Sequence, residues 1–592
     1  MSECMLAFQA DAPVRLAAAS PEIKLGDPIA NASAAVSAIK RAEKAEADYL
    51  VLPELFLCGA TLGSLTEHPL ILSQCREALS LVAEATKHNQ LLVSIGLPYR
   101  IDGRVRSCIA LIRCGRVCAV IPASRGAANP FGFIPHVPGG SSSRSTLTPI
   151  PRLSAGFAGA IFLEKPEPRE GHIMLLSGSL NATAKSYGIV KNRLAAYSAR
   201  TGMAVALALP GRGESTTSFV FDSYCAIAAN GEILAESKPL DSDAFVCADV
   251  CIDKLSSFEP FTEGEEDGYV SKNPEKAEEQ LRRLFALQSA GLVRRAEHIG
   301  AKGFVIGVSG GLDSALALLV AAAAAGEMGI SRNMITGISM PGFGTTGRTK
   351  NNSRSLVEAL GCKYREISVA NACRGHFADI GHDESIRNSV YENAQARERT
   401  QILLDIANED GLLDVGTGDL SEAALGWTTF GGDHLAQYGV NASVPKTIIR
   451  RVVATVGKDF GEAADSVLKD ILATPVSPEL LPANDGEISQ KTEELVGSYE
   501  LHDLFIYYFL KGKGPKELYE IALNNLDFPE DEVYRTLGIF IRRFFSQQFK
   551  RNCAPEAPIV CLSVAPAVWS MPSDMVSTAF MAEYSAIKRK LG

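Results

Sequence analysis

The sequence predicts an α/β protein with two domains in one chain. Its 592 residues are more than a single hydrophobic core usually organises. In the first half, short apolar runs alternate with amphipathic helical patterns, as is typical of α/β folds. In the second half, the apolar run FVIGV (304–308) meets a glycine-rich turn and then a helix-forming run, ALALLV (315–320). Both patterns predict sheets covered by helices.

The first domain is expected over residues 1–255. Residues 31–47 have apolar side chains at three- and four-residue steps, which predicts a helix. A segment rich in Gly, Ser and Pro, 125–151, predicts a long loop. Apolar runs predict strands at 14–19, 49–55, 90–97 and 108–115.

A polar, acidic stretch predicts a surface linker over residues 256–274. The second domain is expected over 275–592, and it opens with a helix over 274–300 that leads into the FVIGV strand.

Composition narrows the class of protein. The 58 basic and 68 acidic residues give a net charge of -10, which argues against nonspecific binding to nucleic acid or to an anionic membrane. The 13 cysteines form no CxxC pair, so we expect reduced thiols rather than a disulfide framework or a zinc site. The N-terminus lacks a signal-peptide pattern, and the run from Ala315 is too short to span a bilayer. We therefore expect a cytoplasmic protein.

The first strong chemical signal is the loop SGGLDS, residues 309–314. Free N–H groups at a helix start bind anions, and Gly310 and Gly311 allow the backbone to approach a phosphate closely. Asp313 adds a carboxylate that can bind a metal. The alternative is a tight strand-to-helix turn without a ligand. No lysine follows the glycines, so the loop is not the Walker type.

The SGGxDS form resembles the pyrophosphatase loop of ligases that cleave ATP to AMP and pyrophosphate. Further motifs follow it in order, and together they resemble the synthetase domain of glutamine-dependent NAD synthetases over residues 275–575. They are MPGFGTTGRTKNN (340–352), YENAQARERT (391–400), GTGDLSEAALGWTTFGGDH (416–434), VPKT (444–447), TPVSPEL (474–480), YELHD (499–503) and QQFKR (547–551).

This resemblance implies that Mg-ATP adenylates the nicotinate carboxylate of deamido-NAD and that ammonia then displaces AMP. It implies catalytic roles for Asp313, Glu422 and Lys446, with Asp313 and Glu422 binding Mg²⁺. Arg399 is a further cation within these motifs. The implied ATP-binding residues are Gly307, Val308, Ser309, Gly310, Gly311, Leu312, Asp313, Ser314 and Thr417. The implied deamido-NAD residues are Asn393, Arg397, Glu422, Trp427, Thr428, Thr429, Phe430 and Lys550. Taken singly, each of these residues could have an ordinary structural role.

The first domain resembles a nitrilase, through VRLAAASPEIKLGDPIANASAAV, LVLPELFLCGA and residues 211–235. That family hydrolyses amides with a cysteine nucleophile, a lysine and a glutamate. Glu54 matches the glutamate. Ala123 stands where the resemblance puts the lysine, and Phe162 stands near the cysteine position. No lysine occurs between Lys87 and Lys165, and no cysteine between Cys118 and Cys225.

Two residues could replace the missing groups. Arg125 could supply a cation, and Cys58 is four residues from Glu54. Neither restores the triad, because Cys58 would have to act from the glutamate loop. We therefore predict a nitrilase-like αββα sandwich that does not hydrolyse glutamine, followed by a doubly wound parallel-sheet adenylating domain.

The predicted function is NAD synthesis from free ammonia, or from ammonia supplied by another protein, by a homo-oligomer. Three alternatives stay open: a glutamine-dependent enzyme with an unorthodox triad, a nucleotide-binding scaffold or filament protein without catalysis, and an adenylating amidotransferase for another carboxylate.

Overall fold

The computed structural model describes residues 13–123, 152–162, 165–260, 266–344, 347–474 and 496–591. The predicted loop at 125–151, with Arg125, lies outside these residues. The chain forms two compact units. Unit 1 comprises Met1–Ser215 and Val220–Glu265, and unit 2 comprises Thr216–Phe219 and Glu266–Gly592.

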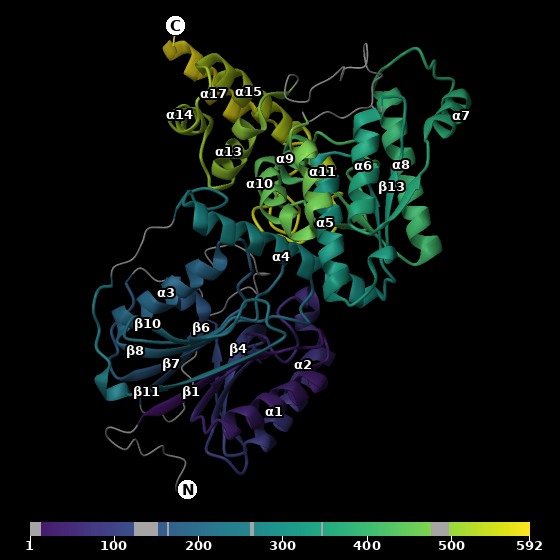
Figure 1. The fold of residues 1–592 in the computed structure, drawn as a ribbon. Helices are drawn as coiled ribbons and strands as arrows, with labels where there is room; N and C mark the ends of the chain where they lie inside the picture. Colours follow the sequence, from purple (N-terminus) through teal and green to yellow (C-terminus); the bar gives the residue numbers. More distant parts are fainter. Residues whose placement is uncertain are drawn as a thin grey trace. The chain divides into compact units, whose positions relative to one another are not determined.

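Unit 1 contains two sheets (Figure 1). The first has the order β11-β1-β2-β3-β4-β5 and the second the order β10-β9-β8-β7-β6. The strands of the first sheet are β1 (Val14–Pro21), β2 (Tyr49–Val51), β3 (Leu92–Ile101), β4 (Arg104–Arg113), β5 (Arg116–Pro122) and β11 (Asp243–Val250). Those of the second are β6 (Leu153–Phe157), β7 (His172–Ser177), β8 (Met203–Ala208), β9 (Cys225–Ala229) and β10 (Glu232–Glu236).

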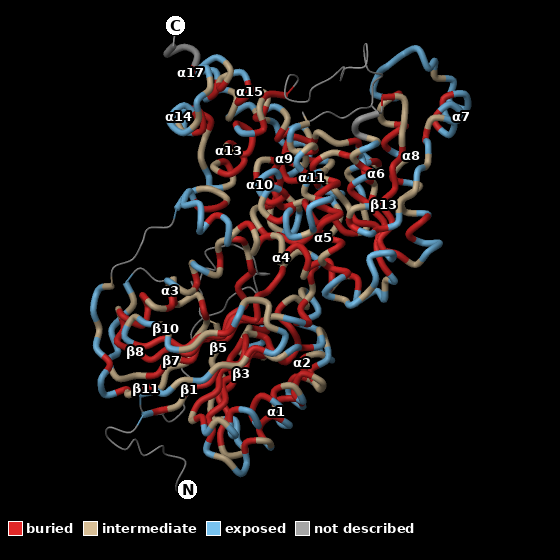
Figure 2. The backbone as a smooth tube through the Cα atoms, in the orientation of Figure 1, coloured by how far each residue is buried: buried red, intermediate tan, exposed pale blue. Residues whose placement is uncertain are grey.

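Helices cover the outer face of each sheet, which gives four layers. On β1, Leu16 and Ala18 point into the core between the sheets, whereas Ala17 and Ala19 pack in the core under α1 and α2. A third cluster lies between β7, β8 and α3. In Figure 2, β3 and β8 are accordingly mostly buried. The helices of unit 1 are α1 (Pro28–Lys44), α2 (Pro69–Ala85), α3 (Ser186–Thr201), η1 (Gly63–Glu67), η2 (Ala158–Phe162) and η3 (Ile252–Lys254).

Several element boundaries differ from the prediction, and two of these differences have a clear local cause. The helix expected at 31–47 begins earlier, because Asp27 caps its first turn and Pro28 occupies the first helical position. The strand expected at 49–55 ends at Val51, because Pro53 has no N–H to donate and Leu55 has a φ of 52°. Glu54 therefore lies in a turn after the strand.

Unit 2 contains a parallel five-stranded sheet in the order β14-β13-β12-β15-β16. The chain runs outward from β12 through β13 to β14 and then returns to β15 on the other side of β12, so the strand order reverses between β12 and β15. Ligands bind at such a switch point in open α/β sheets. The strands are β12 (Phe304–Gly307), β13 (Ile335–Ser339), β14 (Lys363–Glu366), β15 (Leu413–Gly416) and β16 (Tyr438–Gly439).

Helices α5 and α8 both pack against β12. The helices that follow the sheet end in an aromatic-rich cluster formed by α9, α13, α14, α15 and α17. The predicted αββα sandwich and the predicted doubly wound parallel sheet are both confirmed. The helices of unit 2 are α4 (Pro274–Ile299), α5 (Leu312–Glu327), α6 (Gly347–Ala359), α7 (Ala370–Ile380), α8 (Ser389–Asp410), α9 (Leu420–Leu425), α10 (Lys446–Val456), α11 (Glu462–Leu472), α13 (Tyr499–Leu510), α14 (Pro515–Asn525), α15 (Glu530–Ser546), α16 (Gln548–Arg551), α17 (Thr578–Leu591), η4 (Arg332–Met334) and η5 (Gly457–Phe460).

Within the described ranges, no helix has the length and apolarity needed to cross a membrane. The cysteines in those ranges are all free thiols.

Candidate active site

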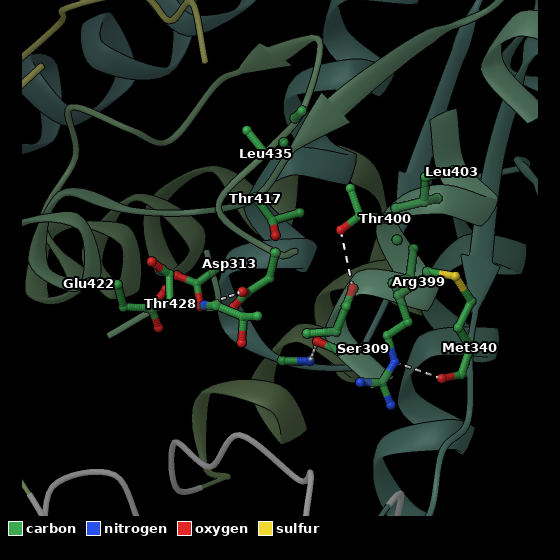
Figure 3. Close-up of a pocket in the computed structure, with 18 of the residues that line it drawn as sticks. Ser309, Asp313, Met340, Arg399, Thr400, Leu403, Thr417, Glu422, Thr428 and Leu435 are labelled. Carbon is green, nitrogen blue, oxygen red and sulfur yellow. Dashed lines mark hydrogen bonds between the residues drawn. The ribbon is translucent and has the colours of Figure 1, made fainter. Parts of the chain in front are cut away.

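A cavity of about 590 Å³ opens at the carboxyl ends of the parallel strands of unit 2 (Figure 3). Most of the residues predicted to bind ATP and deamido-NAD line it. These are Gly307, Val308, Ser309, Gly310, Gly311, Leu312, Asp313, Asn393, Thr417, Glu422, Trp427, Thr428, Thr429 and Lys550, together with Arg399. Four predicted residues, Ser314, Arg397, Phe430 and Lys446, are not among those that line the cavity.

The SGGLDS loop joins β12 to α5. Gly310 has a φ of +82°, which favours glycine, and Gly311 is the N-cap of α5 without a side-chain cap. The Ser314 hydroxyl donates to the Gly311 carbonyl at 3.0 Å, and the Gly311 N–H donates to Ser309 Oγ at 3.2 Å. These bonds fix the loop, and the uncapped N–H groups of the first turn of α5 form a site for an anion.

An acidic cluster lies beside this loop. Asp313, Asp419 and Glu422 each offer an oxygen, and these atoms all lie within 4.8 Å of one another. Lys446 Nζ is 2.6 Å from Asp313, 2.6 Å from Asp419 and 3.0 Å from Glu422, and its side chain is only 4% exposed. Three carboxylates at this spacing are a ligand set suited to a hard cation such as Mg²⁺.

Burial and charge set the ionisation of this cluster. Burial raises the pKa of Glu422 to about 7, although the Lys446 ammonium opposes this shift. Burial also raises the pKa of Asp419 well above its usual range, again against the effect of Lys446. Burial alone would lower the pKa of Lys446, but the three carboxylates raise it well above its ordinary value. The ammonium group therefore stays charged at neutral pH and partly neutralises the cluster.

Asp503 fixes the helices that carry this cluster. Its carboxylate accepts from the Thr447 N–H at 2.9 Å, from the Thr447 hydroxyl at 2.6 Å and from the Ser421 hydroxyl. Ser421 Oγ in turn accepts from the Lys446 N–H at 2.9 Å. Asp503 thus caps the start of α10 from α13 and holds it against α9, which fixes Lys446 relative to Glu422.

Sequence reasoning did not single out Asp419 or Asp503, although both lie in the quoted motifs, GTGDLSE and YELHD. Asp419 had a detectable signal. It precedes Glu422 by three residues, and this spacing predicts an N-cap, as its 2.8 Å bond from the Glu422 N–H shows.

Several of the residues predicted to bind deamido-NAD, among them Asn393, Thr429 and Lys550, line another part of the cavity. The Thr429 hydroxyl donates to Asn393 Oδ1 at 2.8 Å. Lys550 Nζ donates to the carbonyls of Gly426 and Thr428, each at 2.7 Å. These contacts fix the segment after α9 against α8 and α16.

Arg397 and Phe430 lie together away from the cavity lining. Arg397 Nε donates to the Phe430 carbonyl at 3.2 Å, and Phe430 is 44% exposed.

Trp427 lines the cavity, and the guanidinium carbon of Arg543 lies 4.8 Å from the centre of its ring.

In unit 1, Glu54 is held by two serine hydroxyls. Ser107 donates to its Oε1 and Ser179 to its Oε2, both at 2.7 Å. Burial raises the pKa of Glu54, while these two bonds oppose the shift. Ala123 lies nearby, because its N–H donates to the Ser107 carbonyl at 2.9 Å. Phe162 ends η2 and lies under the Arg193 guanidinium, 5.9 Å from the ring centre.

The family comparisons agree with both units. A model of NAD synthase matches residues 287–554, and a model of carbon-nitrogen hydrolase matches residues 15–116. The chain is 31% identical to the glutamine-dependent NAD(+) synthetase of Mycobacterium tuberculosis, over 95% of this chain and 96% of that protein. It is 30% identical to the NH(3)-dependent NAD(+) synthetase of Hyperthermus butylicus, over 44% of this chain and 88% of that protein.

Solved structures share the fold. The glutamine-dependent NAD(+) synthetase of Cytophaga hutchinsonii superposes with a TM-score of 0.76 at 18% identity, over 97% of this chain and all of that one. The enzyme of the same name from Acinetobacter baumannii, solved with ADP, has a TM-score of 0.65 at 17% identity and covers 91% of this chain and 94% of that one.

The fold, the site and the sequence similarity thus define a ligase built from a carbon-nitrogen hydrolase unit and a nucleotide-binding synthetase unit. The chain belongs to the NAD synthetase family. It is accordingly an NAD synthetase.

Proposed function

We propose that this chain amidates deamido-NAD with ATP and Mg²⁺, and that it uses ammonia because unit 1 cannot release ammonia from glutamine. The proposal that unit 1 cannot hydrolyse glutamine depends on which residue follows strand β6. The strand ends at Phe157, so the next residue, Ala158, stands where the resemblance expects the nucleophilic cysteine. We infer that Ala158, rather than Phe162, is the counterpart of that cysteine.

Packing around Glu54 supports this inference. The Glu54 N–H donates to the Gly178 carbonyl at 3.3 Å. A Cβ atom added to Gly178 would lie only 2.3 Å from the Ala158 Cβ, so the backbone at Gly178 packs closely against Ala158. Ala158 is 1% exposed, and its methyl group has no lone pair with which to attack an amide.

Cys58, four residues from Glu54 in the sequence, does not replace the missing nucleophile. Cys58 is fully buried, and its sulfur contacts the carbonyls of Leu55 and Gly59 at 3.6 and 3.4 Å. A hydrogen bond with Cys75, reinforced by burial, raises the pKa of the Cys58 thiol well above its usual range. The thiolate that acyl transfer requires is therefore disfavoured.

Glu54 itself is engaged at both oxygens. Ser107 and Ser179 occupy one carboxylate oxygen each, and the lysine position holds the methyl group of Ala123. These contacts suit a carboxyl group that joins β4 to the segment after β7, and they favour a structural role. We therefore propose that unit 1 is a pseudo-glutaminase.

In unit 2, the proposed reaction has two steps. A nicotinate carboxylate oxygen attacks the α-phosphorus of ATP, the bond to the β-phosphate oxygen breaks, and pyrophosphate leaves. Ammonia then attacks the acyl carbon, AMP leaves, and the nitrogen loses a proton to give the amide. The α5 N–H groups and Ser309 would hold the phosphates.

Asp313, Asp419 and Glu422 would hold Mg²⁺, which supplies positive charge where the phosphates carry negative charge. Lys446 adds a second, permanent positive charge at the same point. Asn393, Trp427 and Lys550 would bind deamido-NAD, and their position along the same cavity supports this assignment.

From the sequence we also propose a homo-oligomer that works in the cytoplasm and receives free ammonia or ammonia from a separate protein. One alternative is favoured by the relatives that are named glutamine-dependent. In that alternative, unit 1 hydrolyses glutamine with a different nucleophile.

The test supplies Mg-ATP and deamido-NAD with ammonium or glutamine as the only nitrogen source and measures NAD and AMP. The Asp313→Ala variant is the negative control. NAD from ammonium alone supports the proposal. Efficient NAD formation from glutamine would refute the pseudo-glutaminase, and no NAD from either source would favour a nucleotide-binding scaffold.

A further inference from the structure

Asn441 is a buried asparagine between β16 and α10, and its side chain connects two loops of the active site. It is 0% exposed. Its Nδ2 group donates to the Asp313 carbonyl at 3.0 Å and to the Thr417 carbonyl at 3.2 Å. Asp313 lies in the first turn of α5 and Thr417 follows β15, and both line the cavity (Figure 3). One amide group therefore connects the SGGLDS loop with the segment that leads to Asp419 and α9.

A second buried amide fixes the orientation of the first. Gln288 of α4 is 0% exposed, and its Nε2 group donates to the Val440 carbonyl at 2.9 Å and to Asn441 Oδ1 at 3.0 Å. A backbone carbonyl only accepts hydrogen bonds, so the Val440 carbonyl requires the amide nitrogen of Gln288 at this contact. The carbonyls of Asp313 and Thr417 require the amide nitrogen of Asn441 in the same way. Asn441 thus turns its oxygen toward Gln288 and its nitrogen toward the two loops.

The backbone of Asn441 also begins the turn that leads to α10. Its carbonyl accepts from the Val444 N–H at 2.8 Å, and the Val444 carbonyl accepts from the Leu420 N–H at 3.1 Å. Lys446 is the first residue of α10, and Leu420 is the first residue of α9. The segments that carry the three carboxylates and the lysine of the acidic cluster therefore meet at Asn441 or at the turn that it begins.

We propose that Asn441 is a positioning residue for the ATP and metal site, and that Gln288 orients it. This proposal rests on the binding of Mg-ATP in the proposed function. Asp313 comes from one of the connected loops, whereas Asp419 and Glu422 come from the other side, so the connection between the loops sets the spacing of the three carboxylates. Mg²⁺ demands near-ideal octahedral geometry, so a small shift between these segments should weaken its binding.

The test measures the equilibrium binding of Mg-ATP and of deamido-NAD, together with the Tm, for the wild type and Asn441→Leu. Leucine has a similar shape but cannot donate, so the two loops lose their connection. Mg-ATP should bind about tenfold more weakly to the variant than to the wild type. Deamido-NAD should bind within about twofold of the wild type, because Asn393, Thr429 and Lys550 line another part of the cavity. A loss of stability alone would not separate the two ligands in this way.

Ser443→Ala is the matched control in the same segment. Ser443 is 1% exposed, and its hydroxyl donates to the Pro558 carbonyl at 2.8 Å and accepts from the Val560 N–H at 2.9 Å. Losing these bonds should lower the Tm, as Asn441→Leu does, but leave the binding of Mg-ATP unchanged. Unchanged binding of Mg-ATP in Asn441→Leu, or an equal weakening in Ser443→Ala, would overturn the proposal.

Gln288→Leu provides the test if Asn441→Leu does not fold. This variant keeps the donor amide of Asn441 but removes the bond that orients it, so Mg-ATP should bind about threefold more weakly. Unchanged binding would overturn the proposal in that case. Because no turnover is measured, failure here is distinct from failure to make NAD, and a wild type that does not bind Mg-ATP would refute the proposed function itself.

Discussion

Lys446 provides the sharpest test of the site in unit 2, because one substitution leaves three carboxylates without their cation. In Lys446→Met the chain keeps a side chain of similar length, while Asp313, Asp419 and Glu422 lose an ammonium at 2.6 to 3.0 Å. Removing one partner of a buried ion pair costs about 3–5 kcal/mol. We expect a loss of this size in the metal-free protein, since the Lys446 side chain is 4% exposed.

This free energy converts to a melting temperature. The entropy of unfolding is about 2.1 cal/mol/K per residue, so the roughly 330 residues of unit 2 give about 0.7 kcal/mol/K. The expected decrease in Tm is therefore about 4–7 °C. The two tryptophans of the chain, Trp427 and Trp569, both belong to unit 2, so tryptophan fluorescence reports the unfolding of this unit.

Lys469→Met is the control, because Lys469 pairs with Asp465 at 2.7 Å but is 73% exposed. Its Tm should change by about 1 °C or less, as for an ordinary surface pair. Mg²⁺ should raise the Tm of Lys446→Met more than that of the wild type, because the ion and the ammonium compete for the same carboxylates. A metal-free Tm equal to that of the wild type, or an equal response to Mg²⁺, would refute the assignment.

Three further predictions concern single residues. Asp313→Ala should abolish AMP formation, because it removes a carboxylate from the metal cluster. AMP formation at the wild-type rate in this variant would contradict that role. Glu54→Ala should leave ammonium-driven NAD synthesis nearly unchanged in a steady-state assay, and a large loss of kcat in a folded variant would show that Glu54 is more than structural. Burial lowers the pKa of His502 to about 4, so the folded state favours the neutral imidazole. The stability that this residue contributes is therefore complete above pH 6.5. It is lost as the pH falls, and the free energy of unfolding decreases by about 2 kcal/mol between pH 7 and pH 5. The tryptophan-monitored stability of unit 2 should therefore fall less between pH 7 and 5 in His502→Gln than in the wild type, and an equal fall in both would contradict this pKa.

The local parts of the site were predictable from sequence. FVIGV and ALALLV flank a short glycine-rich turn, and this pattern alone predicts β12, the loop and α5. The helix expected at 274–300 is α4, because Asn273 caps its start and Gly300, with a φ of +66°, ends it.

Long-range contacts were beyond the reach of a single sequence. Lys446 and Asp313 are 133 residues apart, and their ion pair depends on how α10 meets the start of α5. Asp503 and Ser421 are 82 residues apart, and only the packing of α13 against α9 brings them into contact. The counterpart of the nucleophilic cysteine could be assigned to Ala158 only because the structure shows that β6 ends at Phe157. The sequence around Ala158 differs too much from the family motif to reveal where this strand ends.

The central claim is that the amide nitrogen of NAD comes from ammonia and not from glutamine hydrolysed in unit 1. Its most direct test supplies Mg-ATP, deamido-NAD, unlabelled ammonium and glutamine labelled with ¹⁵N at the amide, and then measures the mass of the NAD formed. The account predicts unlabelled NAD and no release of glutamate. NAD that carries ¹⁵N, with an equal amount of glutamate, would contradict it.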